Sequence, residues 1–195
     1  MASAAFADFH APPPGSLPAD LEALLRLWQR QHPPLLHLLA ELGCTVIDRD
    51  YQPALLDPEG YLSRSDLADP AVRAHHAAIE GVSAYISFVI ENDEGEVIGY
   101  WHGPEQRSLH EAPIVKLDAE GRFELLPGRH LIEALLGDLG RGDPAALGEL
   151  ARLFAGLGIV APARGRGEPV WPDAATHPAS LQQRLYEAAL DPRRH

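Results

Sequence analysis

The sequence YISFVIENDEGEVIGYWHG, residues 85–103, places two runs rich in β-branched and aromatic residues on either side of the tetrapeptide NDEG. Asparagine, aspartate and glycine tolerate the positive φ angles that join two antiparallel strands, so we expect a β-hairpin with its turn at 92–95. Side chains alternate between the two faces of a strand. We therefore expect Ile86, Phe88 and Ile90 to share one face of the sheet.

A second hairpin is expected after a polar connection at residues 102–112. The run PIVKL at 113–117 predicts a third strand, DAEG at 118–121 predicts a turn, and residues 122–126 predict a fourth strand. Apolar residues then recur at helical spacing over 131–136, where one helix face can be buried against the sheet. In the simplest topology, all neighbouring strands are antiparallel.

Apolar residues at helical spacing, with proline or aspartate at the starts and glycine at the ends, predict further helices. These cover residues 21–31, 35–42, 70–80, 144–157 and 179–190. Gly43 and Gly81 are expected to end the second and third of them, because glycine readily adopts the left-handed conformation. A short strand is expected at 44–47 and an irregular loop at 48–69.

This order of elements predicts an α+β fold, in which an antiparallel sheet built from two consecutive hairpins is flanked by N-terminal and C-terminal helices. Prolines interrupt residues 1–18, which we expect to form a flexible, proline-rich arm. Residues 19–137 form the predicted α+β domain. Residues 138–195 are expected to be a helical extension, packed on the domain or tethered to it.

Charge restricts the classes of partner. The chain has 195 residues with 16 Lys plus Arg against 28 Asp plus Glu, a formal charge of −12, and Lys116 is its only lysine. Nucleic-acid binding depends on neutralising phosphates with cations, so we do not expect it. An acidic surface attracts a basic protein, although the same acidity also serves solubility.

Two further features bear on the compartment. The chain has no run of roughly 18 apolar residues and no segment typical of a signal peptide, so we expect no membrane contact. Cys44 is the single cysteine and has no internal disulfide partner, which suits a reducing compartment. We therefore expect a cytoplasmic protein.

The usual signatures of catalysis are missing from the sequence. It contains no phosphate-binding G-x-x-x-x-G-K-[ST] loop, no G-x-S-x-G elbow and no H-E-x-x-H zinc motif. His76 and Glu80 are four residues apart on a predicted helix, which permits two ligands to one metal, and His75, His102 or His110 would have to complete the site. A small metal-dependent hydrolase is therefore the alternative. We expect no enzyme activity, no cofactor and no metal.

A succession of short motifs runs from residue 41 to residue 136. They are ELG at 41–43, DY at 50–51, GYW at 99–101, PIV at 113–115 with Asp118, and LIEALL at 131–136. In this order they resemble the SMI1/KNR4 (SUKH) superfamily, most closely over 83–136. The superfamily's leucine–proline step before the tyrosine segment is missing here, and residues beyond 136 lie outside its pattern.

The resemblance implies a function. Bacterial members of the superfamily are largely immunity proteins of polymorphic toxin systems, so the resemblance implies a module that neutralises a toxin by stoichiometric binding. The expected partner is a protein, with a basic toxin domain as the leading class. Eukaryotic relatives imply a regulatory scaffold instead, and the sequence does not separate the two.

Candidate partner-binding residues lie at the hairpin turn, at the end of its second strand and in the following loop. Tyrosine and tryptophan are enriched at interface hot spots, and turn acids can contact a basic toxin. A buried core and a solvated turn remain the alternative interpretations of the same side chains. The candidates are Tyr100, Trp101, Glu91, Asp93, Glu94, Glu96, His102 and Glu105.

Overall fold

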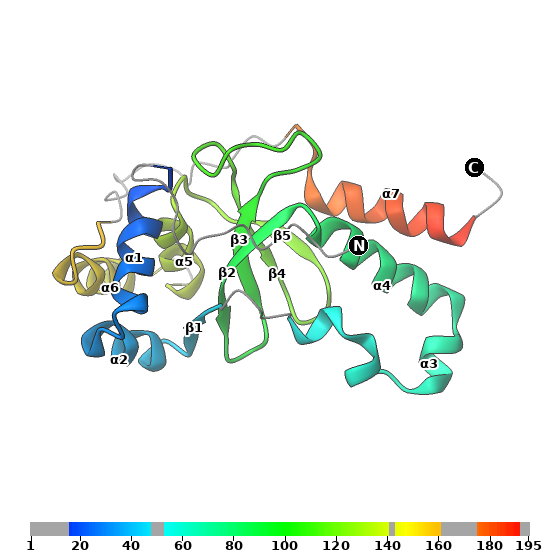
Figure 1. The fold of residues 1–195 in the computed structure, drawn as a ribbon, viewed down its shortest axis with the longest axis horizontal. Helices are drawn as coiled ribbons and strands as arrows, with labels where there is room; N and C mark the ends of the chain where they lie inside the picture. The colour runs from blue at the N-terminus through cyan, green and yellow to red at the C-terminus, as the bar shows by residue number, and fades with distance from the viewer. Residues whose placement is uncertain (1–15, 48–52, 141–142, 161–174, 192–195) are drawn as a thin grey trace.

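The computed structural model describes residues 16–47, 53–140, 143–160 and 175–191. Within them the chain forms seven α-helices, two short 3-10 helices and a five-stranded antiparallel sheet (Figure 1), which confirms the predicted α+β class. The strands are β1 (Cys44–Val46), β2 (Ile86–Asn92), β3 (Val97–Trp101), β4 (Ile114–Leu117) and β5 (Phe123–Leu125). The α-helices are α1 (Ala19–Gln29), α2 (Pro33–Glu41), α3 (Arg64–Ala68), α4 (Pro70–Ser83), α5 (Leu131–Leu139), α6 (Pro144–Gly156) and α7 (Pro178–Leu190), and the 3-10 helices are η1 (Ala54–Leu56) and η2 (Pro58–Gly60).

The sheet has the order β1-β2-β3-β4-β5, so each strand pairs with its neighbour in the chain. Both predicted hairpins are present. In the β2–β3 turn, the Gly95 amide donates to the Asn92 carbonyl oxygen at 2.9 Å, and Gly95 has a φ of +77°. In the β4–β5 turn, Asp118 Oδ1 accepts from the amides of Glu120 and Arg122, each at 2.9 Å. The turn chemistry therefore sets the register of both hairpins.

A β-bulge in β2 changes which face its side chains occupy. The register against β3 shifts by one residue between Phe88 and Ile90, so Val89 is an extra residue. Ile86 and Phe88 belong to one core cluster, whereas Ile90 belongs to the other. The prediction that these three side chains share a face is wrong at Ile90, because a bulge inverts the alternation beyond it.

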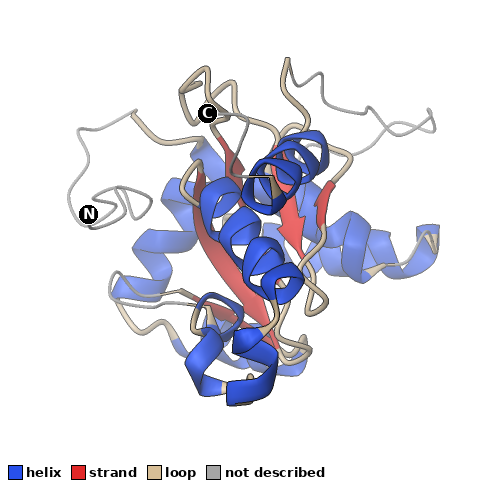
Figure 2. Ribbon diagram, turned by 90° about the vertical axis from the view of Figure 1, so that its right-hand side faces the viewer, coloured by secondary structure: helices blue, strands red, loops and turns tan. Residues whose placement is uncertain are grey.

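Helices cover both faces of the sheet, which gives the molecule three layers (Figures 1 and 2). The helices α1, α2, α5 and α6 lie on one side, and α4 and α7 lie on the other. A separate core cluster fills the space on each side, with Tyr100 in the first and Trp101 in the second. Every residue of β3 is buried as a result.

Helix α4 continues through Gly81 to Ser83, so the prediction that Gly81 ends this helix is wrong. A Cβ atom at position 81 would lie 2.8 Å from Leu185 Cδ1 of α7. Glycine here allows two helices to approach each other closely. Gly43, in contrast, follows α2 with a φ of +62°, as predicted for a helix stop.

A short helix, α3, lies within the segment predicted to be irregular. The Ser63 hydroxyl oxygen accepts from the Asp66 amide at 3.2 Å, and the Asp66 carboxylate accepts from the Ser63 amide at 3.0 Å. This capping box has a recognisable sequence pattern, S-x-x-D, which indicates a helix start within the segment predicted to be a loop. The predictions made for residues 1–15, 48–52 and 161–174 lie outside the described residues.

The C-terminal helices contact the 19–137 domain directly. Phe154 of α6 is fully buried in the first cluster. On the opposite side, Leu181 of α7 belongs to the second cluster, and the Gln182 side chain donates to the Gly121 carbonyl oxygen at 2.6 Å. Figure 2 shows these helical layers from the side.

Asp20 connects the first helix to the fifth. Its side chain is almost fully buried, and its Oδ2 atom accepts from the Ile132 amide in the first turn of α5 at 3.0 Å. A carboxylate at a helix N-terminus satisfies an amide that has no partner within the helix and also complements the helix dipole. Asp20 thereby fixes α5, whose other end contributes to the site described next.

Candidate protein-binding site

A groove opens where the β2–β3 turn meets the C-terminal ends of α2 and α5. Its volume is about 610 Å³. We call it the acidic groove, because carboxylates outnumber the single ammonium group in its lining. It is lined by Glu41, Leu42, Gly43, Asn92, Asp93, Glu94, Glu96, Lys116, Asp138 and Leu139.

The hairpin turn that carries most of the acids is held by hydrogen bonds. Asn92 Oδ1 accepts from the amides of Glu94 and Glu96 at 3.1 and 2.9 Å, and Asn92 Nδ2 donates to Glu96 Oε2 at 2.8 Å. The Asp93 amide donates to the Gly43 carbonyl oxygen at 2.8 Å, which ties the turn to the start of β1. The acids therefore extend from a backbone whose polar groups are already paired.

Lys116 lies among these carboxylates, with its side chain only 14% exposed. Its Nζ atom is 2.9 Å from Asp138 Oδ1 and 3.4 Å from Glu96 Oε1. Burial alone would lower the pKa of the Lys116 ammonium group, but the hydrogen bond to Asp138 and the charges of Asp138 and Glu96 raise it above its ordinary value. Lys116 therefore stays charged and compensates the two inner carboxylates.

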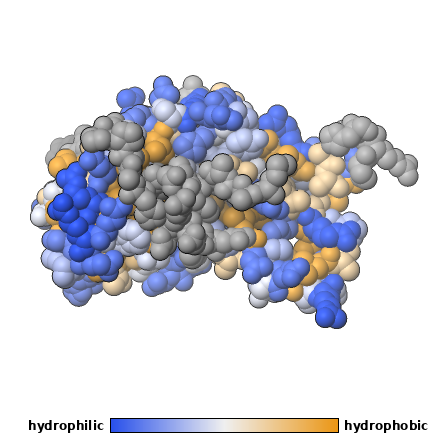
Figure 3. Space-filling model, in the orientation of Figure 1, coloured by the Kyte–Doolittle hydropathy of each residue, from blue (hydrophilic) through white to orange (hydrophobic). Residues whose placement is uncertain are grey.

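The outer carboxylates of the acidic groove lack such compensation. Asp93 and Glu94 are exposed, and neither forms an ion pair with another residue in the part of the chain that the structure describes. Glu41 lies 3.2 Å from His37 Nε2, and both of these side chains are well exposed. In the space-filling view, hydrophilic side chains predominate over the end of the molecule formed by α1, α2 and α6 (Figure 3).

Three of the predicted site residues, Asp93, Glu94 and Glu96, line the acidic groove together. Glu91 does not line it. This residue lies within β2, paired with Thr45 on one side and Val97 on the other.

Tyr100 and Trp101 are only 0% and 1% exposed, so neither has surface for a partner to contact. The Trp101 indole N–H donates to the Thr176 carbonyl oxygen at 2.9 Å, and its ring meets the Tyr85 ring edge-on. Burial, followed by the charge of Asp20, raises the pKa of Tyr100 well above its ordinary value. Both aromatic side chains belong to the core because helices cover both faces of the sheet.

His102 fixes the loop that follows β3. Its Nδ1 atom is 2.6 Å from the Arg107 carbonyl oxygen, and its Nε2 atom is 2.8 Å from Ser87 Oγ. A carbonyl oxygen only accepts, so Nδ1 donates to it, and in this tautomer Nε2 accepts a hydrogen bond from the Ser87 hydroxyl. Hydrolases use such a serine–histidine pair, but Ser87 is only 3% exposed and does not line the acidic groove.

Glu105 belongs to the same loop as His102, at the end of β3 that is farthest from the β2–β3 turn. Its Oε1 atom accepts from the Thr176 hydroxyl at 2.5 Å. This hydrogen bond is the main cause that lowers the pKa of the Glu105 carboxyl group. Tyr100, Trp101, His102 and Glu105 are thus separated from the acidic groove.

The histidines proposed for a metal site are dispersed. His76 Nε2 lies 2.9 Å from the Leu55 carbonyl oxygen, whereas the His75 ring meets the ring of Tyr186 on α7. Among the described residues, no group of three or more His, Cys, Asp and Glu side chains is arranged to hold a metal ion.

Glu41 and Asp138 belong to the acidic groove but were missed from the sequence. They come from the last turns of α2 and α5, far from the hairpin in the chain. An acidic residue near a helix C-terminus opposes the helix dipole. This placement does not identify the two residues from the sequence, because Asp138 lies outside the helix predicted over 131–136 and only tertiary packing brings both residues to the hairpin.

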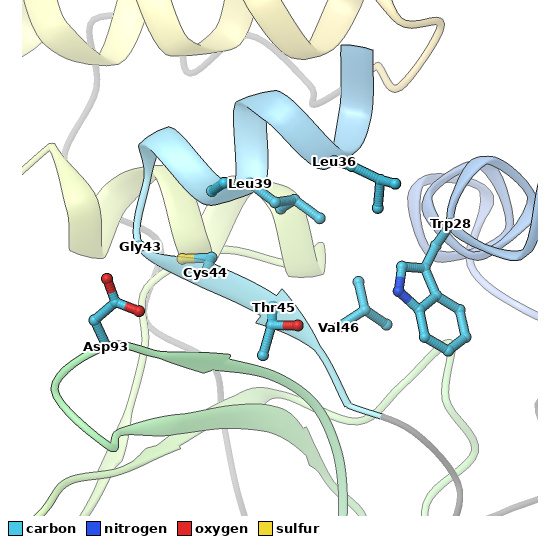
Figure 4. A pocket seen from close by; sticks show the side chains of 9 residues that line it. Trp28, Leu36, Leu39, Gly43, Cys44, Thr45, Val46 and Asp93 are labelled. Atoms are coloured by element: carbon cyan, nitrogen blue, oxygen red, sulfur yellow. The ribbon is translucent and has the colours of Figure 1, made fainter. Parts of the chain in front are cut away.

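A second depression, which we call the edge groove, lies between α1, α2 and β1 and has a volume of about 370 Å³ (Figure 4). Burial, followed by the charges of Asp93 and Asp138, raises the pKa of the Cys44 thiol to about 11. Cys44 is therefore protonated and poorly nucleophilic at neutral pH. The lining residues are Trp28, Leu36, Leu39, Ala40, Gly43, Cys44, Thr45, Val46 and Asp93.

Comparisons with protein-family models, with curated proteins and with solved structures each found no match to this chain. Among the described helices, none has the length and apolar character needed to cross a membrane.

Proposed function

We propose that the protein is a non-enzymatic binding module whose acidic groove receives a basic segment of a protein partner. One observation carries the proposal: carboxylates from α2, α5 and the β2–β3 hairpin converge on one groove, where the chain's only lysine is already paired. Like charges held close together repel each other. A basic partner relieves this repulsion, and the field of the groove accelerates its approach.

The class of partner is proposed from the sequence resemblance. Immunity proteins of the SMI1/KNR4 superfamily suggest that the partner is a bacterial toxin domain, which this protein would neutralise by stoichiometric occlusion. Because helices cover both faces of the sheet, we place the contact at the acidic groove and not on an outer sheet face. The single cysteine fits an assignment to the cytoplasm.

Co-expression with toxin domains encoded beside this gene tests the proposal. The expected result is rescue of growth and recovery of a complex of one protein with one toxin. Failure to protect or bind in every such pairing would remove the immunity function.

A matched pair of charge variants tests the groove. Asp93→Lys with Glu94→Lys reverses two outer carboxylates, and we expect affinity for the toxin to fall by roughly a hundredfold, since each lost contact between close opposite charges weakens binding about tenfold. Glu80→Lys with Glu149→Lys changes the net charge equally at exposed positions on α4 and α6. Equal loss in the two double variants would show that net charge, and not the groove, determines binding.

A further inference from the structure

The free edge of β1 carries backbone groups that the sheet does not use. β1 is the first strand in the sheet order, so β2 is its only neighbour in the described sheet. The Ile47 amide donates to the Val89 carbonyl oxygen of β2 at 2.8 Å, so the backbone N–H and C=O groups of Ile47, and of Thr45 two residues earlier, point toward β2. Backbone groups of successive residues point alternately toward and away from an antiparallel neighbour, so Cys44 and Val46 direct their N–H and C=O groups away from β2.

No described backbone group pairs with these outward groups of Cys44 and Val46. Natural proteins usually protect such an edge with a lysine, a proline, a bulge or a covering helix or loop. β1 has the sequence CTV, without lysine or proline, and its pairing with β2 has no bulge. Cys44 and Val46 are only 7% and 5% exposed, so access to this edge is through the edge groove that they line. An open edge of this kind can bind an extended peptide as an additional strand.

The edge groove runs along this open edge. Cys44, Thr45 and Val46 all line it, although Thr45 points to the opposite face of the strand from its two neighbours. A groove lined by three consecutive strand residues follows the edge of the strand, because a groove above one face would meet only alternate residues. Its opposite wall is apolar and is formed by Trp28 of α1 and by Leu36, Leu39 and Ala40 of α2 (Figure 4).

The two grooves are continuous. Gly43 and Asp93 line both of them. The acidic groove lies beyond the Gly43 end of β1, and Val46 lies about 10 Å away at the rise of an extended chain. An extended segment of a few residues is therefore long enough to reach both grooves, with basic side chains at one end and apolar side chains at the other.

We propose that the partner's basic segment binds as an extended strand added to β1. Its backbone pairs with Cys44 and Val46, its basic side chains occupy the acidic groove, and an apolar side chain enters the edge groove beside Trp28. A basic segment is the proposed occupant because its positive charge complements the carboxylates of the acidic groove. The inference rests on the proposed function, because it specifies how a basic partner occupies that same site.

A synthetic peptide tests strand addition without knowledge of the natural partner. The probe is the end-capped heptapeptide Lys-Thr-Lys-Thr-Val-Thr-Val, whose two lysines and two valines share one face of a strand. The same residues in reverse order test the opposite strand direction. A peptide with the same side chains but N-methylated at alternate backbone amides keeps the charge and blocks pairing along one edge.

Amide hydrogen exchange, measured by NMR on the full chain, provides the readout. We expect the Cys44 and Val46 amides to exchange rapidly in the free protein and at least tenfold more slowly with one of the two peptides, whereas Thr45 is slow throughout. N-methylation should weaken binding of that peptide at least tenfold. Reversal of Asp93 and Glu94 to lysine should weaken it as well.

Four other outcomes would overturn the inference. Equal binding of the N-methylated peptide, still lost on reversal of Asp93 and Glu94, would retain the acidic groove and reject strand addition. Absence of binding by both heptapeptides up to millimolar concentration would reject strand addition, whereas the proposed function is tested separately by co-expression with toxin domains. Slow exchange of the Cys44 and Val46 amides in the peptide-free protein would show that the edge is already occupied. If this protection rises with protein concentration, the occupant is a second copy of the protein. If the protection does not change with concentration, the occupant is another part of the same chain.

Discussion

Gly99 has no space for a side chain, because it lies opposite the bulge in β2. A Cβ atom there would come 2.3 Å from the Ser87 carbonyl oxygen and 2.7 Å from Phe88 Cα, and backbone atoms cannot rotate away. We expect Gly99→Ala to lower the free energy of unfolding by about 1–3 kcal/mol, as overpacking usually does. Urea denaturation measures this change.

A glycine in α6 provides the matched control. The nearest atom to a Cβ at Gly148 is the end of the Arg152 side chain at 3.8 Å, so alanine fits there. We expect Gly148→Ala to stabilise the protein by up to about 1 kcal/mol, because alanine favours helix more than glycine does. If both substitutions destabilised the protein equally, crowding at the bulge would not be the cause.

Ionisation of the Cys44 thiol makes the free energy of unfolding depend on pH in the alkaline range. Burial and the nearby acids raise the pKa of its thiol from 9.0 to about 11 in the folded protein. The folded state thus holds its proton more strongly, so this contribution to stability is complete below pH 9 and is lost as the pH rises toward 11. We expect Cys44→Ala to lose less stability than the wild type over this interval in urea denaturation. Parallel pH profiles for the two proteins would contradict the assignment.

At the scale of elements, Trp101 connects β3 to the segment that leads into α7. We expect Trp101→Ala to lower the free energy of unfolding by about 3–5 kcal/mol, because it removes a large side chain from the core. Trp101→Phe keeps an aromatic ring but loses the hydrogen bond to the Thr176 carbonyl oxygen, and its expected effect is about 1–2 kcal/mol. Limited proteolysis should cut this variant faster near residue 175. A wild-type cleavage rate would show that the bond does not hold this segment.

Elements were predictable where local chemistry decides them. Turn residues such as Gly95 and Gly121 located both hairpins, and Asp69 and Asp143 marked the starts of α4 and α6. The end of α4 was not predictable, because contact with α7 at Gly81 decides it. The sequence does indicate that both faces of the sheet are covered, because β3 is an unbroken apolar run of the kind typical of a strand buried on both sides.

At the scale of the whole molecule, the net charge of −12 and the acidic groove together favour rapid association with a basic partner. We expect the association rate of the wild type to fall as salt rises, because screening acts over about 10 Å at 0.1 M salt. Reversal of Asp93 and Glu94 to lysine should slow association at low salt and change the free energy of unfolding by less than about 0.5 kcal/mol. Stopped-flow mixing measures the rates, and an unchanged rate at low salt would exclude steering by the hairpin turn.

The candidate site was only partly predictable. The acids of the β2–β3 turn are adjacent in the sequence, so their cluster was evident before the fold was known. Glu41, Lys116 and Asp138 join them only through tertiary structure, from elements that no local pattern connects. The interface propensity of tyrosine and tryptophan favours Tyr100 and Trp101 as contact residues, but the helices on both sides of the sheet enclose them.

The sheet order that follows the chain has a consequence for folding kinetics. Short turns join β2 to β3 and β4 to β5, so these two hairpins can form with little loop-closure entropy, whereas residues 47–85, which include α3 and α4, separate β1 from β2. Docking of α7 and of the residues just before it is different, because the hydrogen bonds from Trp101 to Thr176 and from Gln182 to Gly121 span 75 and 61 residues of sequence. During synthesis, the second face of the sheet therefore keeps apolar surface exposed until residues 175–191 leave the ribosome.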